Sequence, residues 1–227
     1  MKVLSIIPAR GGSKSIPKKN IVDLLGKPLI SWTIEASLNS KYISKTIVSS
    51  DDNEILEISK KYGATPYKRD VNLSGDYIKT EPVLLDVINN LEEEYDFLIL
   101  LQATSPLRNF EHIDAAFEKF FESNNEALIS VYEPDHSPFK AFTVENNGVL
   151  KGIVNDEYPF SPRQLLPKAY YPNGAIYIIN INTFLKNKSL FISKNTGFYI
   201  MDKNSSKDID SYIELQEVEE ILMSRSF

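Results

Sequence analysis

Apolar and polar positions alternate in two different ways along the first 132 residues of the chain. Short runs rich in valine, isoleucine and leucine are separated by longer stretches with the apolar spacing of an amphipathic helix. Short apolar runs predict buried strands, and strands that alternate with amphipathic helices are typical of βαβ units and a mostly parallel sheet. The expected strands are residues 3–7, 46–49, 65–68, 97–101 and 128–132.

The stretches between these runs predict four helices. In the first of them Ile30, Ile34 and Leu38 recur every four residues and predict one buried stripe. Asp51 and Asp52 directly precede the second helix, and we interpret both as residues that cap its N-terminus. The expected helices are residues 28–38, 53–62, 81–91 and 111–121.

The pattern changes after Tyr132. Residues 142–144 and 149–154 flank an Asn-Gly pair and predict an antiparallel hairpin. The stretch 156–173 is rich in proline and tyrosine, and it is too apolar to be a bare linker. Two returning strands and a terminal helix are expected after it, with Ile209, Ile213, Val218, Ile221 and Leu222 facing the core; their ranges are residues 174–181, 197–201 and 209–223.

The expected fold is therefore α/β, a Rossmann-like and mostly parallel sheet flanked by helices, with a small antiparallel excursion. We expect a single domain over residues 1–227, into which residues 139–172, here called the arm, are inserted. The arm is apolar and has no obvious burial site within one layered α/β domain. It is expected either to contact a partner or to cover an edge of its own sheet.

The composition of the chain argues against several kinds of site and of ligand. The chain has 227 residues, no cysteine and only two histidines, which argues against disulfides, zinc-thiolate sites and histidine metal clusters. The absence of cysteine fits a cytoplasmic protein. A formal net charge of -6 argues against general nucleic-acid binding, and neither a signal peptide nor an apolar run of membrane-spanning length is seen.

One cationic segment stands out directly after the first expected strand. The segment from Arg10 to Asn20 carries four cations and no anion, and Gly11 and Gly12 allow backbone N–H groups to approach oxygen ligands. Ligands of such sheets bind beyond the carboxyl ends of the strands, so we expect this loop to bind a polyphosphate. It matches neither the Walker loop nor the dinucleotide fingerprint, and a solvated basic loop is the alternative.

Two carboxylates near the C-terminus form a second candidate site. Asp208 and Asp210 are two residues apart, so both side chains point the same way if the segment is extended. Such a pair suits a hard cation such as Mg²⁺. Alternatively, both acids cap the helix that follows.

Four segments resemble the acylneuraminate cytidylyltransferase family, also called CMP-sialic acid synthetases. They are Ile7-Pro-Ala-Arg-Gly-Gly-Ser-Lys-Ser-Ile-Pro-Lys-Lys-Asn20, Leu100-Leu-Gln-Ala-Thr-Ser-Pro-Leu-Arg108, the stretch from Pro162-Arg-Gln to Pro172-Asn-Gly-Ala-Ile-Tyr177, and Asp208-Ile-Asp210. The resemblance implies a CTP-dependent nucleotidyltransferase that couples CTP to a nonulosonic acid and releases pyrophosphate. The first choice of acid is N-acylneuraminate.

The resemblance also implies roles for particular residues. Arg10, Lys19, Asp208 and Asp210 would be catalytic, and the two aspartates would hold Mg²⁺. The residues implied for the nucleotide are Arg10, Gly11, Gly12, Ser13, Lys19, Asn20, Arg69 and, on loose spacing, Thr80. Those implied for the sugar acid are Gln102, Lys140, Arg163, Asn173, Tyr177 and Phe191.

Some positions leave alternatives open. The family tends to have two adjacent aromatics where this chain has Leu190-Phe191, and Tyr177 also suits the core of its strand. Other substrates in keeping with the resemblance are legionaminic, pseudaminic and 3-deoxy-manno-octulosonic acids. Sugar-1-phosphate nucleotidyltransferases are a third possibility, but the motif at the start of those enzymes does not appear in this chain. A non-catalytic nucleotide-sugar sensor is the alternative of another class.

The family's dimerisation implies a homodimer here. The arm would bring Lys140 or Arg163 toward the acid-binding pocket of the partner.

Overall fold

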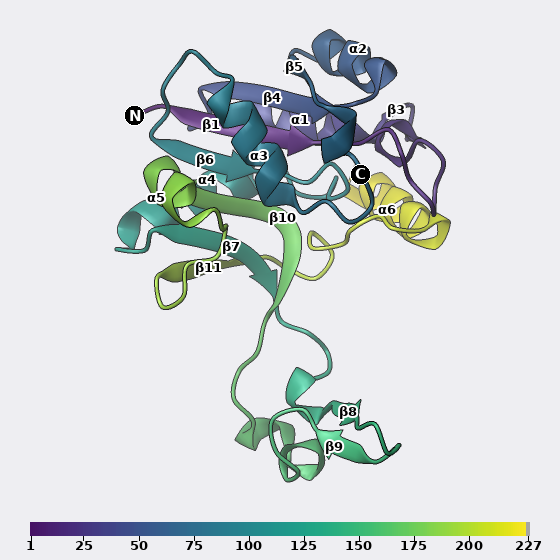
Figure 1. Cartoon of the computed structure of the whole chain (residues 1–227). Coiled ribbons are helices and arrows are strands. Elements are labelled where there is room, and N and C mark those ends of the chain that lie inside the picture. Colours follow the sequence, from purple (N-terminus) through teal and green to yellow (C-terminus); the bar gives the residue numbers. More distant parts are fainter. Residues whose placement is uncertain (226–227) are drawn as a thin grey trace.

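A seven-stranded sheet forms the centre of the protein, described by a computed structural model for residues 1–225 (Figure 1). The strand order is β11-β7-β10-β6-β1-β4-β5. Strand β10 runs antiparallel to β6 and β7, and every other neighbouring pair is parallel. The strands are β1 (Val3–Pro8), β4 (Lys45–Ser50), β5 (Thr65–Lys68), β6 (Phe97–Leu100), β7 (Ala127–Tyr132), β10 (Tyr171–Asn180) and β11 (Thr196–Ile200). The expected Rossmann-like, mostly parallel fold is confirmed.

Helices cover both faces of the sheet. Apolar side chains of α1, α2 and α4 pack on one face, and those of α3 and α5 pack on the other. Helix α6 packs against the segment that follows β1, in a third cluster. None of the helices in the described residues is long and apolar enough to span a membrane. The helices are α1 (Leu29–Asn39), α2 (Asn53–Lys61), α3 (Thr80–Asn89), α4 (Phe110–Glu122), α5 (Ile181–Asn187) and α6 (Tyr212–Arg225).

Several expectations at the level of single residues were wrong. Ile30 and Ile34 are fully buried, but Leu38 is 46% exposed because it lies in the last turn of α1. Ile213 is 70% exposed, since α6 buries Leu215, Val218 and Leu222 instead. Two features were not expected from the sequence: α5, and a short hairpin whose strands β2 (Asp23–Leu24) and β3 (Lys27–Pro28) have two residues each.

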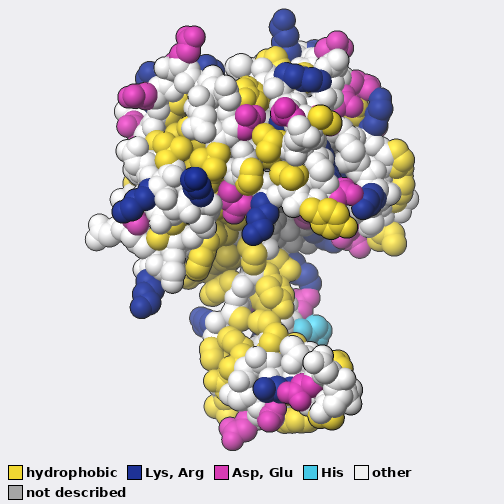
Figure 2. All heavy atoms as spheres, in the orientation of Figure 1, with side chains coloured by type: hydrophobic (Ala, Val, Ile, Leu, Met, Phe, Trp, Pro, Cys, Tyr) yellow, Lys and Arg dark blue, Asp and Glu magenta, His cyan; other side chains and the backbone are white. Residues whose placement is uncertain are grey.

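The chain leaves the sheet after β7, returns at β10, and projects from the body between these strands (Figure 1). Here β8 (Phe142–Val144) pairs with β9 (Leu150–Gly152), which confirms the expected hairpin, and Gly148 takes the positive φ of +80° in its turn. Apolar side chains cover the junction of the arm with the body and lie around the rim of the arm (Figure 2). Those that are exposed include Phe142, Val144, Val149, Leu150, Ile153, Val154, Phe160 and Leu165.

Candidate active site

Two adjoining hollows lie at one edge of the sheet, the first at the carboxyl ends of β1 and β6 and the second beside the end of β7 and the start of β10. We call the first, of about 410 Å³, the crevice, and the second, of about 490 Å³, the side pocket. Gln102 and Asp208 line both, so the hollows meet at these two residues. The crevice is also lined by Arg10, Lys19, Asn20, Arg69, Asp76, Thr80, Thr104 and Asp210. The side pocket is also lined by Tyr132, Asn173, Gly174, Tyr177, Lys203, Ser206, Lys207, Glu214 and Glu217.

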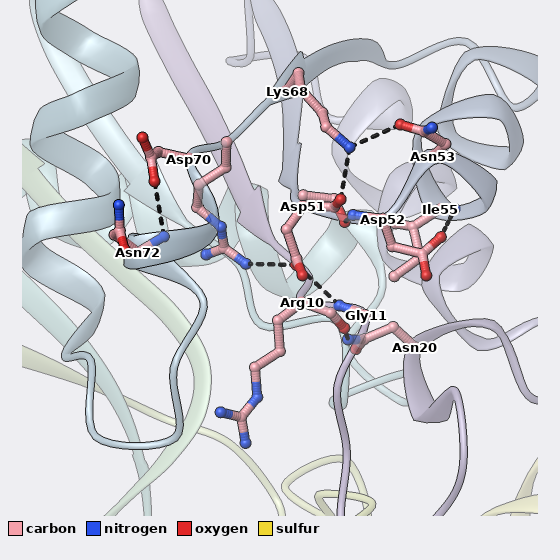
Figure 3. A network of polar contacts seen from close by, with 12 residues as sticks. Arg10, Gly11, Asn20, Asp51, Asp52, Asn53, Ile55, Lys68, Asp70 and Asn72 are labelled. Carbon is pink, nitrogen blue, oxygen red and sulfur yellow. Dashed lines mark hydrogen bonds and ion pairs between the residues drawn. The ribbon is translucent and has the colours of Figure 1, made fainter.

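The loop after β1 is held against the end of β4. The backbone N–H of Gly11 donates to Asp51 Oδ1 at 3.0 Å, and Asn20 Nδ2 donates to the carbonyl of Arg10 at 2.9 Å (Figure 3). A Cβ at Gly11 would lie 2.8 Å from the side chain of Asp52, so glycine is required for this close approach. The Arg10 side chain points away from the Asp51 cluster (Figure 3).

The cations of this loop differ in where they point. Arg10 Nη1 lies 2.8 Å from Asp76 Oδ1, and Lys14 Nζ lies 2.6 Å from the other oxygen of the same carboxylate. The Lys14 side chain is 79% exposed, whereas that of Lys19 is only 15% exposed and lines the crevice. Lys19 Nζ lies 2.7 Å from Asp210 Oδ1. The loop therefore directs Arg10 and Lys19 into the crevice.

Arg69 follows β5 and is buried in the crevice wall. Its Nη2 lies 3.7 Å from Asp51 Oδ1, and neither Nε nor Nη2 has a hydrogen-bond partner within residues 1–225. Burial lowers the pKa of Arg69, and the charge of Asp51 opposes this shift. A buried donor without a hydrogen bond is costly, and Nη2 has only its long ion pair with Asp51, so the guanidinium keeps donor capacity that a ligand would satisfy.

Asp51 corrects one interpretation made from the sequence. Asp52 alone caps α2, because its Oδ1 accepts from the backbone N–H groups of Glu54 and Ile55 at 2.8 and 3.2 Å. Asp51 instead joins the glycine loop to Arg69. In the sequence, only the position of Asp51 directly after an expected strand indicated that it lies near the glycine loop.

Asp208 and Asp210 lie opposite Lys19, before α6. The backbone N–H of Ile209 donates to the carbonyl of Thr104 at 2.9 Å and ties this segment to the loop after β6. Helix α6 starts at Tyr212, and Ser211 Oγ accepts from its third residue, Glu214, at 3.4 Å. Ser211 is thus the cap, and the alternative that both aspartates cap the helix is wrong.

Asp208 is an unusual carboxylate. Its Oδ1 is buried and has no hydrogen-bond partner in the described part of the chain. Burial raises the pKa of Asp208, and the nearby charge of Asp210 adds to the rise while Lys19 opposes it. Asp208 lines the crevice, and a buried carboxylate oxygen without a hydrogen bond is an arrangement that a bound cation would satisfy.

Three of the residues expected to contact the sugar acid line the side pocket. Burial raises the pKa of Tyr177, and the charge of Asp208 adds to this rise. The Asn173 amide donates to Ser206 Oγ at 2.9 Å and accepts from Ser130 Oγ at 2.5 Å, so it organises the pocket wall. The third residue, Gln102, lies where the side pocket meets the crevice.

The other three lie outside both hollows of their own chain. Arg163 of the arm pairs with Glu133, directly after β7, at 3.1 Å. Lys140 is exposed in a 3₁₀ turn of the arm. Phe191 is 60% exposed and lies between α5 and β11, at the end of the sheet opposite the crevice. A single chain therefore does not bring these three side chains to the site.

Three residues that line the two hollows were not predicted from the sequence: Asp76, Lys203 and Lys207. Lys203 pairs with Asp135 and Lys207 pairs with Glu217, and both lysines line the side pocket. Of these three residues, only Lys207 had a sequence position that pointed to the site, because it directly precedes Asp208.

The chain matches a known protein family over nearly its whole length. The family model described as Cytidylyltransferase matches residues 4–223. The chain belongs to the cytidylyltransferase family. A pseudaminic acid cytidylyltransferase of Campylobacter jejuni is 40% identical over 221 residues, which cover 95% of this chain and 94% of that protein. An N-acylneuraminate cytidylyltransferase of Streptococcus agalactiae is 37% identical over 93% of this chain, but over only 51% of its own length.

A solved structure supports the fold of this cytidylyltransferase. The structure of CMP:2-keto-3-deoxy-manno-octonic acid synthetase complexed with CTP matches with a TM-score of 0.74 over all of both chains, at 18% identity. The family resemblance noted in the sequence and the expectation of a CTP-dependent nucleotidyltransferase are confirmed.

The two lysines of the glycine loop should differ in this cytidylyltransferase. Lys19→Ala is expected to raise the KM for CTP about 10- to 100-fold, since a hydrogen bond to a charged group is worth about 1.5–3 kcal/mol. Lys14→Ala removes an exposed side chain outside the crevice and should change this KM less than about threefold. Steady-state kinetics with varied CTP measures both. Equal and small effects would make the loop a solvated basic face.

Proposed function

We propose that the protein transfers CMP from CTP to the anomeric hydroxyl of a nonulosonic acid and releases pyrophosphate. The observation that carries this proposal is the meeting of two hollows at Gln102 and Asp208. The crevice presents Arg10, Lys19 and Arg69, whose Nε has no hydrogen-bond partner in the described residues, and these cations suit a triphosphate. The side pocket has a polar lining that suits a hydroxylated acid.

In the proposed reaction the hydroxyl oxygen of the acid attacks the α-phosphorus of CTP. The bond from this phosphorus to the pyrophosphate oxygen breaks, and the hydroxyl proton is released. Such a transfer depends on positioning and on neutralising phosphate charge. Arg10 and Lys19 would neutralise the triphosphate, and Gln102 would orient the acid where the hollows meet.

Asp208 and Asp210 are the residues that would hold Mg²⁺. The described residues contain no cluster of three or more metal-binding side chains, so the protein would supply two carboxylates. That number suits Mg²⁺, which usually binds one or two carboxylates together with substrate phosphates and water. The buried, unpartnered Oδ1 of Asp208 fits this assignment. When bound, the ion would neutralise charge on the phosphates.

The substrate we put first is pseudaminic acid. N-acylneuraminate was the first choice from the sequence alone, but the similarity to a pseudaminic acid cytidylyltransferase extends over nearly the whole of both chains. The N-acylneuraminate enzyme is similar over only half of its length, and its acid is the second candidate. The presence of Lys19, Asp208 and Asp210 together in the crevice favours an enzyme over a nucleotide-sugar sensor.

We also propose a homodimer in which each arm completes the partner's site. The exposed apolar side chains of the arm support this proposal. So does the position of Arg163 and Lys140 outside the hollows of their own chain. The hairpin of β8 and β9 forms a sheet of its own rather than pairing with an edge of the main sheet.

A substrate panel tests the proposed activity. Protein, Mg²⁺ and CTP are mixed with pseudaminic, legionaminic, N-acetylneuraminic or 3-deoxy-manno-octulosonic acid, and pyrophosphate release gives kcat/KM for each. We expect the highest value with pseudaminic acid. A preference for N-acetylneuraminic acid would make that acid the proposed substrate in place of pseudaminic acid. If no acid leads to pyrophosphate release, the proposed reaction is refuted.

A further inference from the structure

Arg108 is a fully buried cation that the proposed reaction does not use. It lies just before α4 and has no exposed surface. Its Nη2 donates to the carbonyl of Gln102 at 3.1 Å and to Thr33 Oγ1 at 2.8 Å, and its Nε donates to the carbonyl of Ala175 at 3.4 Å. Its Nη1 has no partner in residues 1–225. Burial lowers its pKa to about 9, so it stays charged at neutral pH.

A buried charge of this kind needs an explanation. No carboxylate of the described chain pairs with this guanidinium, and only uncharged oxygens accept from it. An apolar residue of similar volume often costs a fold little, or stabilises it, when it replaces a buried charged group. Stability alone is therefore a poor reason for an arginine at this position.

The contacts of Arg108 converge on one residue of the site. The carbonyl of Gln102 accepts from both Arg108 and Thr33 Oγ1, the latter at 3.2 Å. On its other side Gln102 contacts Gly174, where a Cβ would lie 2.3 Å from Gln102 Oε1. Arg108 also holds Ala175, the residue after this glycine. One guanidinium thus joins the two segments that enclose Gln102.

We propose that Arg108 is a positioning residue that holds Gln102 where the crevice meets the side pocket, so that the acid is oriented toward the nucleotide. This inference rests on the proposed function. Its effect is specific to the acid, because the cations that face the triphosphate, Arg10 and Lys19, lie on another loop. A small misplacement of an orienting group costs about 100-fold in rate.

A double-mutant cycle tests the inference. Arg108→Met and Gln102→Ala are each expected to lower kcat/KM for the acid about 100-fold, and the double variant should be less than about threefold worse than either single variant. The KM for CTP should stay within about twofold of the wild-type value in Arg108→Met. The proposal would be overturned if the losses in kcat/KM of the two single variants multiplied in the double variant. It would also be overturned if Arg108→Met impaired the use of CTP as much as the use of the acid.

Arg225→Met is the matched control. Arg225 donates to the carbonyl of Leu107 at 3.3 Å in the same loop, but it lies on the surface and does not contact Gln102. It should leave kcat/KM for the acid unchanged, and an equal loss in this variant would assign the effect of Arg108 to loop stability.

Circular dichroism and calorimetric CTP binding show whether each variant folds. If Arg108→Met does not fold, Arg108→Lys takes its place in the cycle, because it keeps the charge but lacks the planar donors that reach three oxygens. A wild-type protein that binds CTP but converts no acid overturns the proposed function and this inference together. If the wild-type protein is active but the losses of the Arg108 and Gln102 variants multiply in the double variant, this inference alone is overturned.

Discussion

Asp208→Asn is expected to lower kcat about 100-fold or more, because it removes a negative ligand at the place where phosphate charge must be neutralised. The variant should fold at least as stably as the wild-type protein. Asparagine has nearly the same shape, and it replaces a carboxylate whose buried Oδ1 has no partner in the described residues. Steady-state kinetics with saturating Mg²⁺ and thermal unfolding without Mg²⁺ give the two readouts.

Asp202→Asn is the control for this experiment. Asp202 belongs to the same segment, but its Oδ1 accepts from the backbone N–H of Ser205 at 3.0 Å, and it lines neither the crevice nor the side pocket. Its activity should stay near the wild-type value. Near-normal, Mg²⁺-dependent turnover in both Asp208→Asn and Asp210→Asn would contradict the assignment of the metal site.

Two inactive variants are expected to restore activity when their subunits exchange. Asp208→Asn and Arg163→Ala should each be inactive alone, because one removes a crevice carboxylate and the other a cation that the arm brings to the partner. A mixed dimer then has one site with both defects and one with neither. Random exchange of equal amounts makes half of the dimers mixed, so about a quarter of the wild-type activity should return.

A mixture of Asp208→Asn with Asp210→Asn is the matched control, because both defects lie in the crevice of their own chain and every site keeps one. It should stay inactive. A monomer by light scattering at micromolar concentration would refute the role of the arm. A dimer without recovery in the first mixture would place Arg163 in the site of its own chain.

The central strands β1, β6 and β7 were predictable because they are largely buried and appear in the sequence as apolar runs. Helix α5 was missed because it follows β10 without a linker. The turn is made by Asn180, whose Oδ1 accepts from the backbone N–H groups of Asn182 and Thr183 at 3.0 and 3.2 Å. Leu38 and Ile213 fit a helical stripe, yet which face of a helix end is covered depends on its neighbours.

Residues in local motifs could be located in advance, and residues that act through distant contacts could not. The glycine loop and the aspartate pair predicted the side of the sheet on which the crevice lies, since both adjoin strand or helix ends. Asp76 meets Arg10 across 66 positions of the chain, and no spacing in the sequence indicates that pairing. The positions of Lys140 and Arg163 relative to a site depend on a second chain and stay predictions.

The central claim is the bond between CMP and the acid, and ³¹P NMR of the reaction mixture tests it most directly. With CTP, Mg²⁺ and pseudaminic acid, the three CTP resonances should give way to one phosphodiester resonance of the CMP-sugar and one pyrophosphate resonance. The pyrophosphate resonance should have twice the intensity, because pyrophosphate carries two equivalent phosphorus atoms. The Asp208→Asn variant should leave CTP unchanged over the same time. Free CMP without a sugar phosphodiester, or CTP that persists with every nonulosonic acid, would contradict the account.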